Sequence, residues 1–284
     1  MRSKFSAIGQ GLACGLSLFT GVAQAALTTV PQSQLNPTQA LYTQDFGTVA
    51  VMTGGGNGSN VGNPSGRNDD GFRGPINLNF ANPLSFFGGS YTSFWANNNG
   101  NISFTGGNSA YVPAGPIGAT VPTISIWFGD VDTRNGSSGV MYVQQNVAEQ
   151  TVVTWDQVGR YNTRGDLLNT FQMVVRGDGY NIPQGEGSIG FFWLGMPWEV
   201  TDTSTTAAVG FGNGVGDGVV LEGSNQAGLN GVVAFHKIWF DPNLRPICGV
   251  PGTPPCETPE PEMPLLLGVA AIAALMVRRR VRLG

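Results

Sequence analysis

Residues 171–176 read Phe-Gln-Met-Val-Val-Arg, and apolar side chains recur at every second position of this stretch. Phe171, Met173 and Val175 share one side of an extended chain, because successive side chains of a β-strand point to opposite faces. The same period of two occurs in residues 140–143, Val-Met-Tyr-Val. Both stretches therefore predict β-strands with one face turned toward a core.

Outward from these stretches, short apolar segments with β-branched and aromatic residues follow one another, separated by turns such as Asn99-Gly100. No helical periodicity of useful length occurs outside the two termini. This pattern predicts an all-β fold, a single β-sandwich-like domain. The predicted strands are residues 41–51, 74–80, 90–96, 101–104, 123–130, 140–145, 150–155, 170–176, 188–194, 207–211, 219–222 and 231–238.

The chain divides into four parts by composition. Residues 26–245 form the predicted β domain, in which the Gly/Asn/Ser-rich stretch 54–70 is expected to be a mobile surface loop. Residues 246–258 are rich in Pro and predict a linker. Residues 1–25 and 259–284 carry targeting signals.

The N-terminal segment has the features of a secretory signal peptide. Basic Arg2 and Lys4 precede an apolar stretch, and Ala23-Gln24-Ala25 is a small-residue cleavage site. We expect signal peptidase to remove residues 1–25, which places the rest of the chain outside the cytoplasm.

The C-terminal segment begins with Pro259-Glu260-Pro261 and continues with the apolar residues 263–277, MPLLLGVAAIAALMV. The basic residues Arg278, Arg279 and Arg280 follow, and the positive-inside rule keeps them cytoplasmic. About 15 apolar residues is short for a span, which needs ~20. A weak or temporary membrane anchor is therefore predicted, and a buried helix of a soluble domain is the alternative.

This segment resembles the PEP-CTERM sorting signal of Gram-negative bacteria, with its elements in the same order. The resemblance implies processing by an exosortase, after which the body is released or attached outside the cell. Proteins with this tail often accompany exopolysaccharide and biofilm-matrix production. The implied route is an inner-membrane anchor in transit, followed by the cell surface or extracellular matrix.

The charge of the predicted external portion excludes some partners. Two of the 14 basic residues lie in the signal peptide and four follow the apolar C-terminal stretch, which leaves eight; all 18 acidic residues lie between Asp45 and Glu262, so the portion between these ends carries a net charge of −10. Such a body would repel nucleic acid, and it would either attract divalent cations or simply remain soluble. Cys248 and Cys256 form an even pair in an oxidising compartment, so a disulfide is predicted, with two free thiols as the alternative.

Several blocks of the domain resemble the NIDO (nidogen-like extracellular) family. They are residues 94–104 (FWANNNGNISF), 124–134 (ISIWFGDVDTR), 153–159, 169–172 and 209–214. Phe128-Gly129 departs from the family's preferred Trp-Ala, and residues 191–198 follow its pattern loosely. The resemblance implies an extracellular domain linked to adhesion or matrix, without established catalytic residues.

The second block contains a candidate calcium site. Asp130 and Asp132 alternate, so both carboxylates face one side, and Asn135 follows in a turn. These oxygen ligands suit Ca²⁺. The alternative is structural: one Asp pairs with Arg134 or another Arg, and the other caps the Asn135-Gly136 turn.

Other chemistry has less support in the sequence. Trp198, beside Pro197 and Glu199, is the best candidate for an exposed sugar-contacting aromatic, although tryptophans are more often core. The only histidine, His236, lies in an apolar stretch, and no catalytic motif is present. We therefore predict a non-enzymatic structural or adhesive protein. A carbohydrate-binding module is the second hypothesis, and a polysaccharide hydrolase using a pair such as Asp130/Glu199 is the third.

Overall fold

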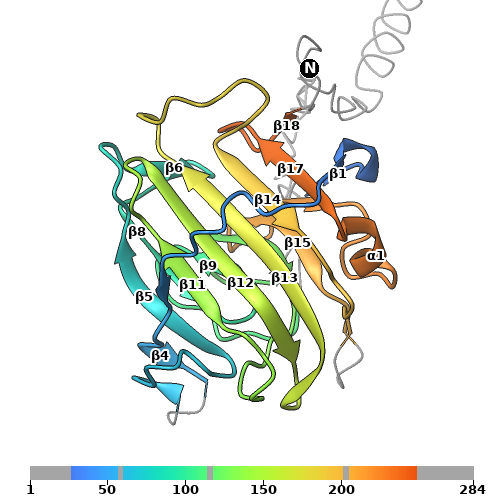
Figure 1. Ribbon diagram of the computed structural model, residues 1–284. Coiled ribbons are helices and arrows are strands. Elements are labelled where there is room, and N and C mark those ends of the chain that lie inside the picture. The colour runs from blue at the N-terminus through green and yellow to red at the C-terminus, as the bar shows by residue number, and fades with distance from the viewer. Residues whose placement is uncertain (1–26, 57–59, 114–117, 201–204, 248–284) are drawn as a thin grey trace, which may run out of the picture.

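The computed structural model describes residues 27–56, 60–113, 118–200 and 205–247, and these residues form two stacked β-sheets (Figure 1). All named strand pairs are antiparallel except β1 with β16. The all-β prediction is therefore confirmed, while the predicted signal peptide, sorting segment and Cys248/Cys256 pair lie outside the described residues. No helix within those ranges is long and apolar enough to cross a membrane.

Each sheet contains eight strands. The first runs, in spatial order, β1 (Leu27–Val30), β16 (Gly218–Leu221), β15 (Ala208–Gly212), β10 (Thr123–Phe128), β9 (Asn101–Ser103), β8 (Ser93–Asn97), β5 (Gly71–Asn77) and β4 (Gly54–Gly55). The second runs β18 (Pro246–Ile247), β17 (His236–Phe240), β14 (Ile189–Trp193), β13 (Arg164–Arg176), β12 (Gln150–Arg160), β11 (Met141–Gln144) and β3 (Thr48–Val49), with β2 (Asn36–Pro37) also paired to β17.

Smaller elements complete the chain. A separate hairpin is formed by β6 (Leu84–Phe86) and β7 (Gly89–Tyr91). A 3-10 turn occupies Gln32–Gln34, and the five-residue helix α1 occupies Leu229–Val233. The first two residues of the predicted linker form β18 and pair with β17, so the β domain extends at least to Ile247.

The core lies between the two sheets and is rich in aromatic rings. Phe191 of β14 stacks on Phe211 of β15, with ring centroids 5.4 Å apart, and this contact joins the sheets. Trp193 of β14 donates a hydrogen bond from its indole N–H to the carbonyl oxygen of Ile126 in β10, at 3.0 Å. Buried aromatic contacts of this kind fix how one sheet sits on the other.

Residues 171–176 lie in β13, and both faces of this strand are covered. Phe171, Met173 and Val175 enter the core, as their alternation predicts. The opposite face is also covered, because the segment between β2 and β3 crosses it (Figure 1, blue trace). There Thr43 exchanges two hydrogen bonds with the buried side-chain amide of Gln172, at 2.9 and 3.1 Å.

Two sequence predictions of strands are wrong. Within residues 41–51 only Thr48–Val49 is a strand, because the preceding residues lie across the outer face of the second sheet. Within residues 231–238 the chain is first helical in α1 and then turns at Phe235, where φ is +58°, into β17. Neither change disturbs the all-β class.

Candidate functional site

Three aspartates from two distant segments meet at one end of the first sheet. Asp69 and Asp70 directly precede β5, and Asp130 follows the end of β10. An isolated antiparallel bridge between Asp69 and Asp132 brings the two segments together. One carboxylate oxygen from each of Asp69, Asp70 and Asp130 lies within 4.8 Å of the others. We call this group the acidic cluster.

The acidic cluster is buried, and its hydrogen bonding is incomplete. Asp130 is 3% exposed and Asp69 is 8% exposed. Within the described part of the chain, the Oδ1 atoms of both residues have no hydrogen-bond partner. Asp70 is half-buried, and its Oδ1 accepts a hydrogen bond from Asn99 Nδ2 at 2.7 Å.

Burial and mutual repulsion change the protonation of these groups. Loss of solvent raises the pKa of Asp130 to about 8, and the neighbouring charges of Asp70, Asp69 and Asp132 add to the effect. The pKa of Asp69 is raised to about 7 for the same main reason. Burial also raises the pKa of Asp70. The chain therefore holds these carboxylates where their negative charge is poorly stabilised.

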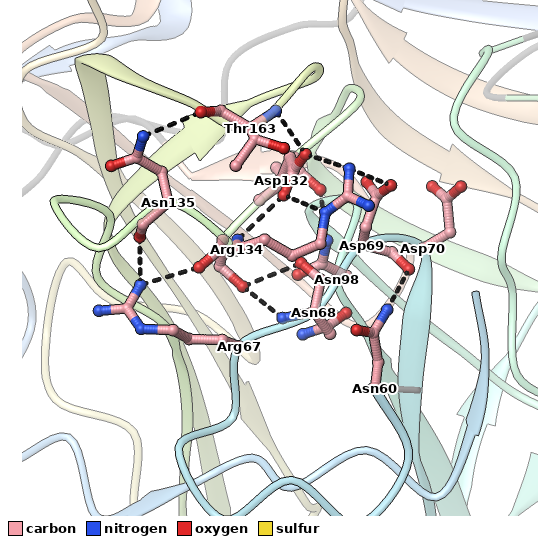
Figure 2. A network of polar contacts seen from close by, with 12 residues as sticks. Asn60, Arg67, Asn68, Asp69, Asp70, Asn98, Asp132, Arg134, Asn135 and Thr163 are labelled. Atoms are coloured by element: carbon pink, nitrogen blue, oxygen red, sulfur yellow. Dashed lines mark hydrogen bonds and ion pairs between the residues drawn. The ribbon is translucent and has the colours of Figure 1, made fainter. Parts of the chain in front are cut away.

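Asp132, by contrast, is completed by protein groups. Its Oδ1 accepts hydrogen bonds from the backbone N–H and Nε of Arg134, each at 2.9 Å, and its Oδ2 accepts one from Thr163 N at 2.7 Å (Figure 2). The Arg134 guanidinium also lies 2.6 Å from Asp132 Oδ2 and 2.8 Å from Asp69 Oδ2. This ion pair matches the structural alternative for one of the two aspartates.

Asn135 serves its own turn. Its Oδ1 accepts a hydrogen bond from Ser137 N at 2.8 Å, and its Nδ2 donates one to Thr163 O at 2.9 Å. The predicted ligand set is thus divided: Asp130 joins Asp69 and Asp70, Asp132 pairs with Arg134, and Asn135 holds a turn. Spacing along one segment could not reveal this, because the other two carboxylates come from residues 69 and 70.

The asparagine-rich turn between β8 and β9 holds the two segments in place. Asn98 and Asn99 are fully buried; Asn98 Nδ2 donates to Val131 O, and Asn99 Oδ1 accepts from Val131 N at 2.9 Å. At Gly100, where φ is +74°, a Cβ would lie 1.8 Å from the carbonyl oxygen of Trp127. Only glycine fits this turn, so the Asn-Asn-Asn-Gly run positions the acidic cluster.

A pocket of about 220 Å³ opens beside the cluster, lined by Asp70, Asp130, Tyr111 and Tyr161. The tyrosines are 43% and 36% exposed, so they stand at the mouth. Tyr161 is tied to the cluster by its backbone N–H, which donates to Asp130 O at 3.1 Å. Two tyrosines and two carboxylates thus line the same pocket, a combination that suits a cation or a polar ligand.

The composition of residues 54–70 predicts a mobile surface loop and does not single out Asp69 and Asp70. Gly54–Gly55 instead forms β4, and Asn68 and Asp69 are buried. The sequence feature that could have indicated them is the pair of adjacent acidic residues, Asp69 and Asp70, immediately before a strand.

Trp198 is not the exposed aromatic that its neighbours Pro197 and Glu199 led us to expect. It is 3% exposed, donates its indole N–H to Val158 O at 3.0 Å, and packs edge-on against Trp127. The prediction of a surface ligand contact there is wrong, because the side chain of buried Asn169 holds the Trp198 backbone and the ring packs inward.

The remaining candidates lie away from the cluster. Glu199, the suggested partner of Asp130 in hydrolysis, does not line the pocket and accepts hydrogen bonds from the backbone N–H groups of Gly228 and Asn230 instead. His236 is half-buried, and its Nδ1 lies 2.8 Å from Ala234 O.

Comparison with known proteins gives one finding. Residues 40–239 match the family described as NIDO related, a range that includes β3 to β16 and all residues of the acidic cluster. No curated protein and no solved structure matches the chain. Since the match covers well over half of the sequence, the chain belongs to the NIDO-related family.

Proposed function

We propose that this protein is an exported, non-catalytic β domain with a structural or adhesive role at the cell surface or in the extracellular matrix. The observation that carries the proposal is the NIDO-related match over residues 40–239, which indicates an extracellular domain. The flanking sequences support it, because an export signal precedes this domain and a PEP-CTERM-like tail follows it. An exosortase and signal peptidase are the processing partners that these signals imply.

The test is intact mass and cell fractionation of the protein from its own host, with and without the exosortase gene. We expect a mature form outside the cell that lacks residues 1–25 and the segment after Pro259-Glu260-Pro261. Alanine substitution of Pro259, Glu260 and Pro261 should leave the protein in the inner membrane. Substitution of Pro254 and Pro255, which lie in the linker just before the sorting segment, is the matched control and should not change sorting. A full-length C-terminus in the membrane of the wild-type host would contradict the proposal.

Carbohydrate binding is the second candidate function, and Tyr111 and Tyr161 at the pocket mouth favour it. Exposed aromatic rings beside hydrogen-bonding groups are a common way to hold sugars. A glycan array with Tyr111→Ala and Tyr161→Ala variants tests this function. Binding that both substitutions remove would support a lectin-like role, and a wild-type protein that binds no glycan would leave the adhesive role to protein contacts.

The absence of catalysis is part of the proposal. A polysaccharide panel incubated with the purified protein should show no new reducing ends. Turnover that Asp130→Asn abolishes would contradict the proposal and support a hydrolase.

A further inference from the structure

We propose that Asp69, Asp70 and Asp130 bind a divalent cation, with Ca²⁺ as the preferred ion. The site goes beyond the proposed surface role and does not depend on it. It differs from the set Asp130, Asp132 and Asn135 that the local sequence pattern predicts, because two of its three carboxylates come from the segment before β5.

The unpaired oxygens of the buried carboxylates are the main evidence for a ligand. In folded proteins, about nine in ten buried polar groups have a hydrogen-bond partner. Asp130 is only 3% exposed and lines the pocket, and its Oδ1 has no hydrogen-bond partner among the described residues. Asp69 Oδ1 is in the same state. These two oxygens belong to carboxylate groups that approach one another within 4.8 Å, so we infer that a ligand from outside the chain completes their coordination.

The balance of charges around the acidic cluster indicates that the ligand is positively charged. The carboxylates of Asp69, Asp70, Asp130 and Asp132 surround one guanidinium, that of Arg134, whose hydrogen bonds go to Asp132 and Asp69. When all four carboxylates are ionised, the group carries three uncompensated negative charges. A divalent cation in direct contact with the acidic cluster would offset most of this charge.

The donor atoms select the class of ion. All three ligands are carboxylate oxygens, which suit hard cations, whereas zinc and copper sites usually include imidazole or thiolate. Ca²⁺ binds oxygen at about 2.3–2.6 Å, so oxygens on opposite sides of the ion lie up to ~5 Å apart. The separations within 4.8 Å fit this arrangement. The pocket of about 220 Å³ leaves room for the waters that complete six to eight ligands.

The site also has a natural optical reporter. Tyr111 and Tyr161 line the same pocket as Asp70 and Asp130. Tb³⁺ takes the same oxygen ligands as Ca²⁺ and emits when a nearby aromatic ring is excited. A Tb³⁺ ion at the cluster should therefore be sensitised by these tyrosines.

The experiment uses full-length protein in detergent, titrated with CaCl₂ by calorimetry and with TbCl₃ by luminescence. We expect one ion per chain, a dissociation constant of about 10⁻⁴–10⁻³ M for Ca²⁺ as in other extracellular modules, and displacement of Tb³⁺ by Ca²⁺. Mg²⁺ should bind at least about tenfold more weakly, because it demands a smaller octahedral site. Mg²⁺ binding as tight as that of Ca²⁺ would overturn the choice of ion.

Asp130→Asn and Asp70→Asn should each weaken Ca²⁺ binding at least tenfold. Asp70→Asn is the second variant because Asp70 is only half-buried and folding should tolerate the change. Asp178→Asn, which alters an exposed acid outside the pocket, is the matched control and should bind like the wild type. Wild-type protein without saturable binding, or Asp130→Asn and Asp70→Asn variants that bind like the wild type, would overturn the proposal.

Discussion

Two buried charged groups in this molecule are treated in opposite ways. Arg176 of β13 is 1% exposed, yet Gln150, Tyr42, Gly187 O and Glu186 accept its hydrogen bonds. Its guanidinium also stacks over the rings of Tyr180 and Trp239, at 4.3 and 4.4 Å. Asp69 and Asp130 of the acidic cluster are also buried, but each keeps one carboxylate oxygen without a hydrogen-bond partner among the described residues.

The difference separates structure from function. A buried charge that the chain satisfies by itself contributes to a defined native state, whereas one left unsatisfied destabilises that state until a partner arrives. The Arg176 contacts hold the segment before β3 on the second sheet. The acidic cluster is the part of the β domain that is prepared for a ligand.

The largest expected effect on stability comes from replacing Arg176, whose hydrogen bonds are satisfied by the chain itself. Arg176→Met should lower the free energy of unfolding by about 3–5 kcal/mol, because Glu186 and the buried acceptors lose their donor. Chemical denaturation should show the same loss with Ca²⁺ and with EDTA. Arg245→Met, at an exposed position, should stay within about 0.5 kcal/mol of the wild type. A loss that Ca²⁺ restores would contradict the division between the two regions.

Removing the positive charge of Arg134, which pairs with both Asp69 and Asp132, should have an intermediate effect on stability. Arg134→Met leaves the fully buried Asp132 without its ion pair, and the partly exposed arginine suggests a loss of about 2 kcal/mol in EDTA. Ca²⁺ should restore part of this stability, since the variant site is more negative. Denaturation curves in Ca²⁺ and EDTA measure both quantities, and a loss that Ca²⁺ leaves unchanged would contradict the charge argument.

A further prediction is a pH dependence in the metal-free protein. The folded state raises the pKa of Asp69 to about 7 and that of Asp130 to about 8, from 3.8. Between about pH 4 and 8 the folded state therefore binds more protons than the unfolded state, so stability must fall as pH rises. The facing groups are Asp70, Asp132 and Arg134. In EDTA, Asp130→Asn should show a shallower fall than the wild type; an identical slope would contradict the assigned cause.

Much of the fold could be predicted from local pattern. The alternation in residues 171–176 gave the inner face of β13, and the Gly/Asn turns separated most of the strands correctly. The outer face could not be predicted. Gln172 and Arg176 have the polar character of solvent-facing positions, and only the crossing segment around Tyr42 and Thr43 makes them buried.

The site was predicted only in part, for a related reason. Asp130 was found because it lies in a distinctive local motif, but its neighbours Asp69 and Asp70 are joined to it by sheet topology. Trp198 was misplaced because neighbours of surface type, Pro197 and Glu199, do not determine the direction of the ring. Local sequence indicates which residues can act, and tertiary pairing decides which of them meet.

Thermal unfolding in about 5 mM CaCl₂ and in EDTA, near neutral pH, tests the central claim most directly. A cation that binds only the folded state with a dissociation constant of about 10⁻⁴–10⁻³ M should stabilise it by about 1–2 kcal/mol. This corresponds to a Tm rise of roughly 3–8 °C for the wild type, and Asp130→Asn should lose it. A wild-type Tm that is the same in Ca²⁺ and EDTA would contradict the claim that the acidic cluster is prepared for a cation.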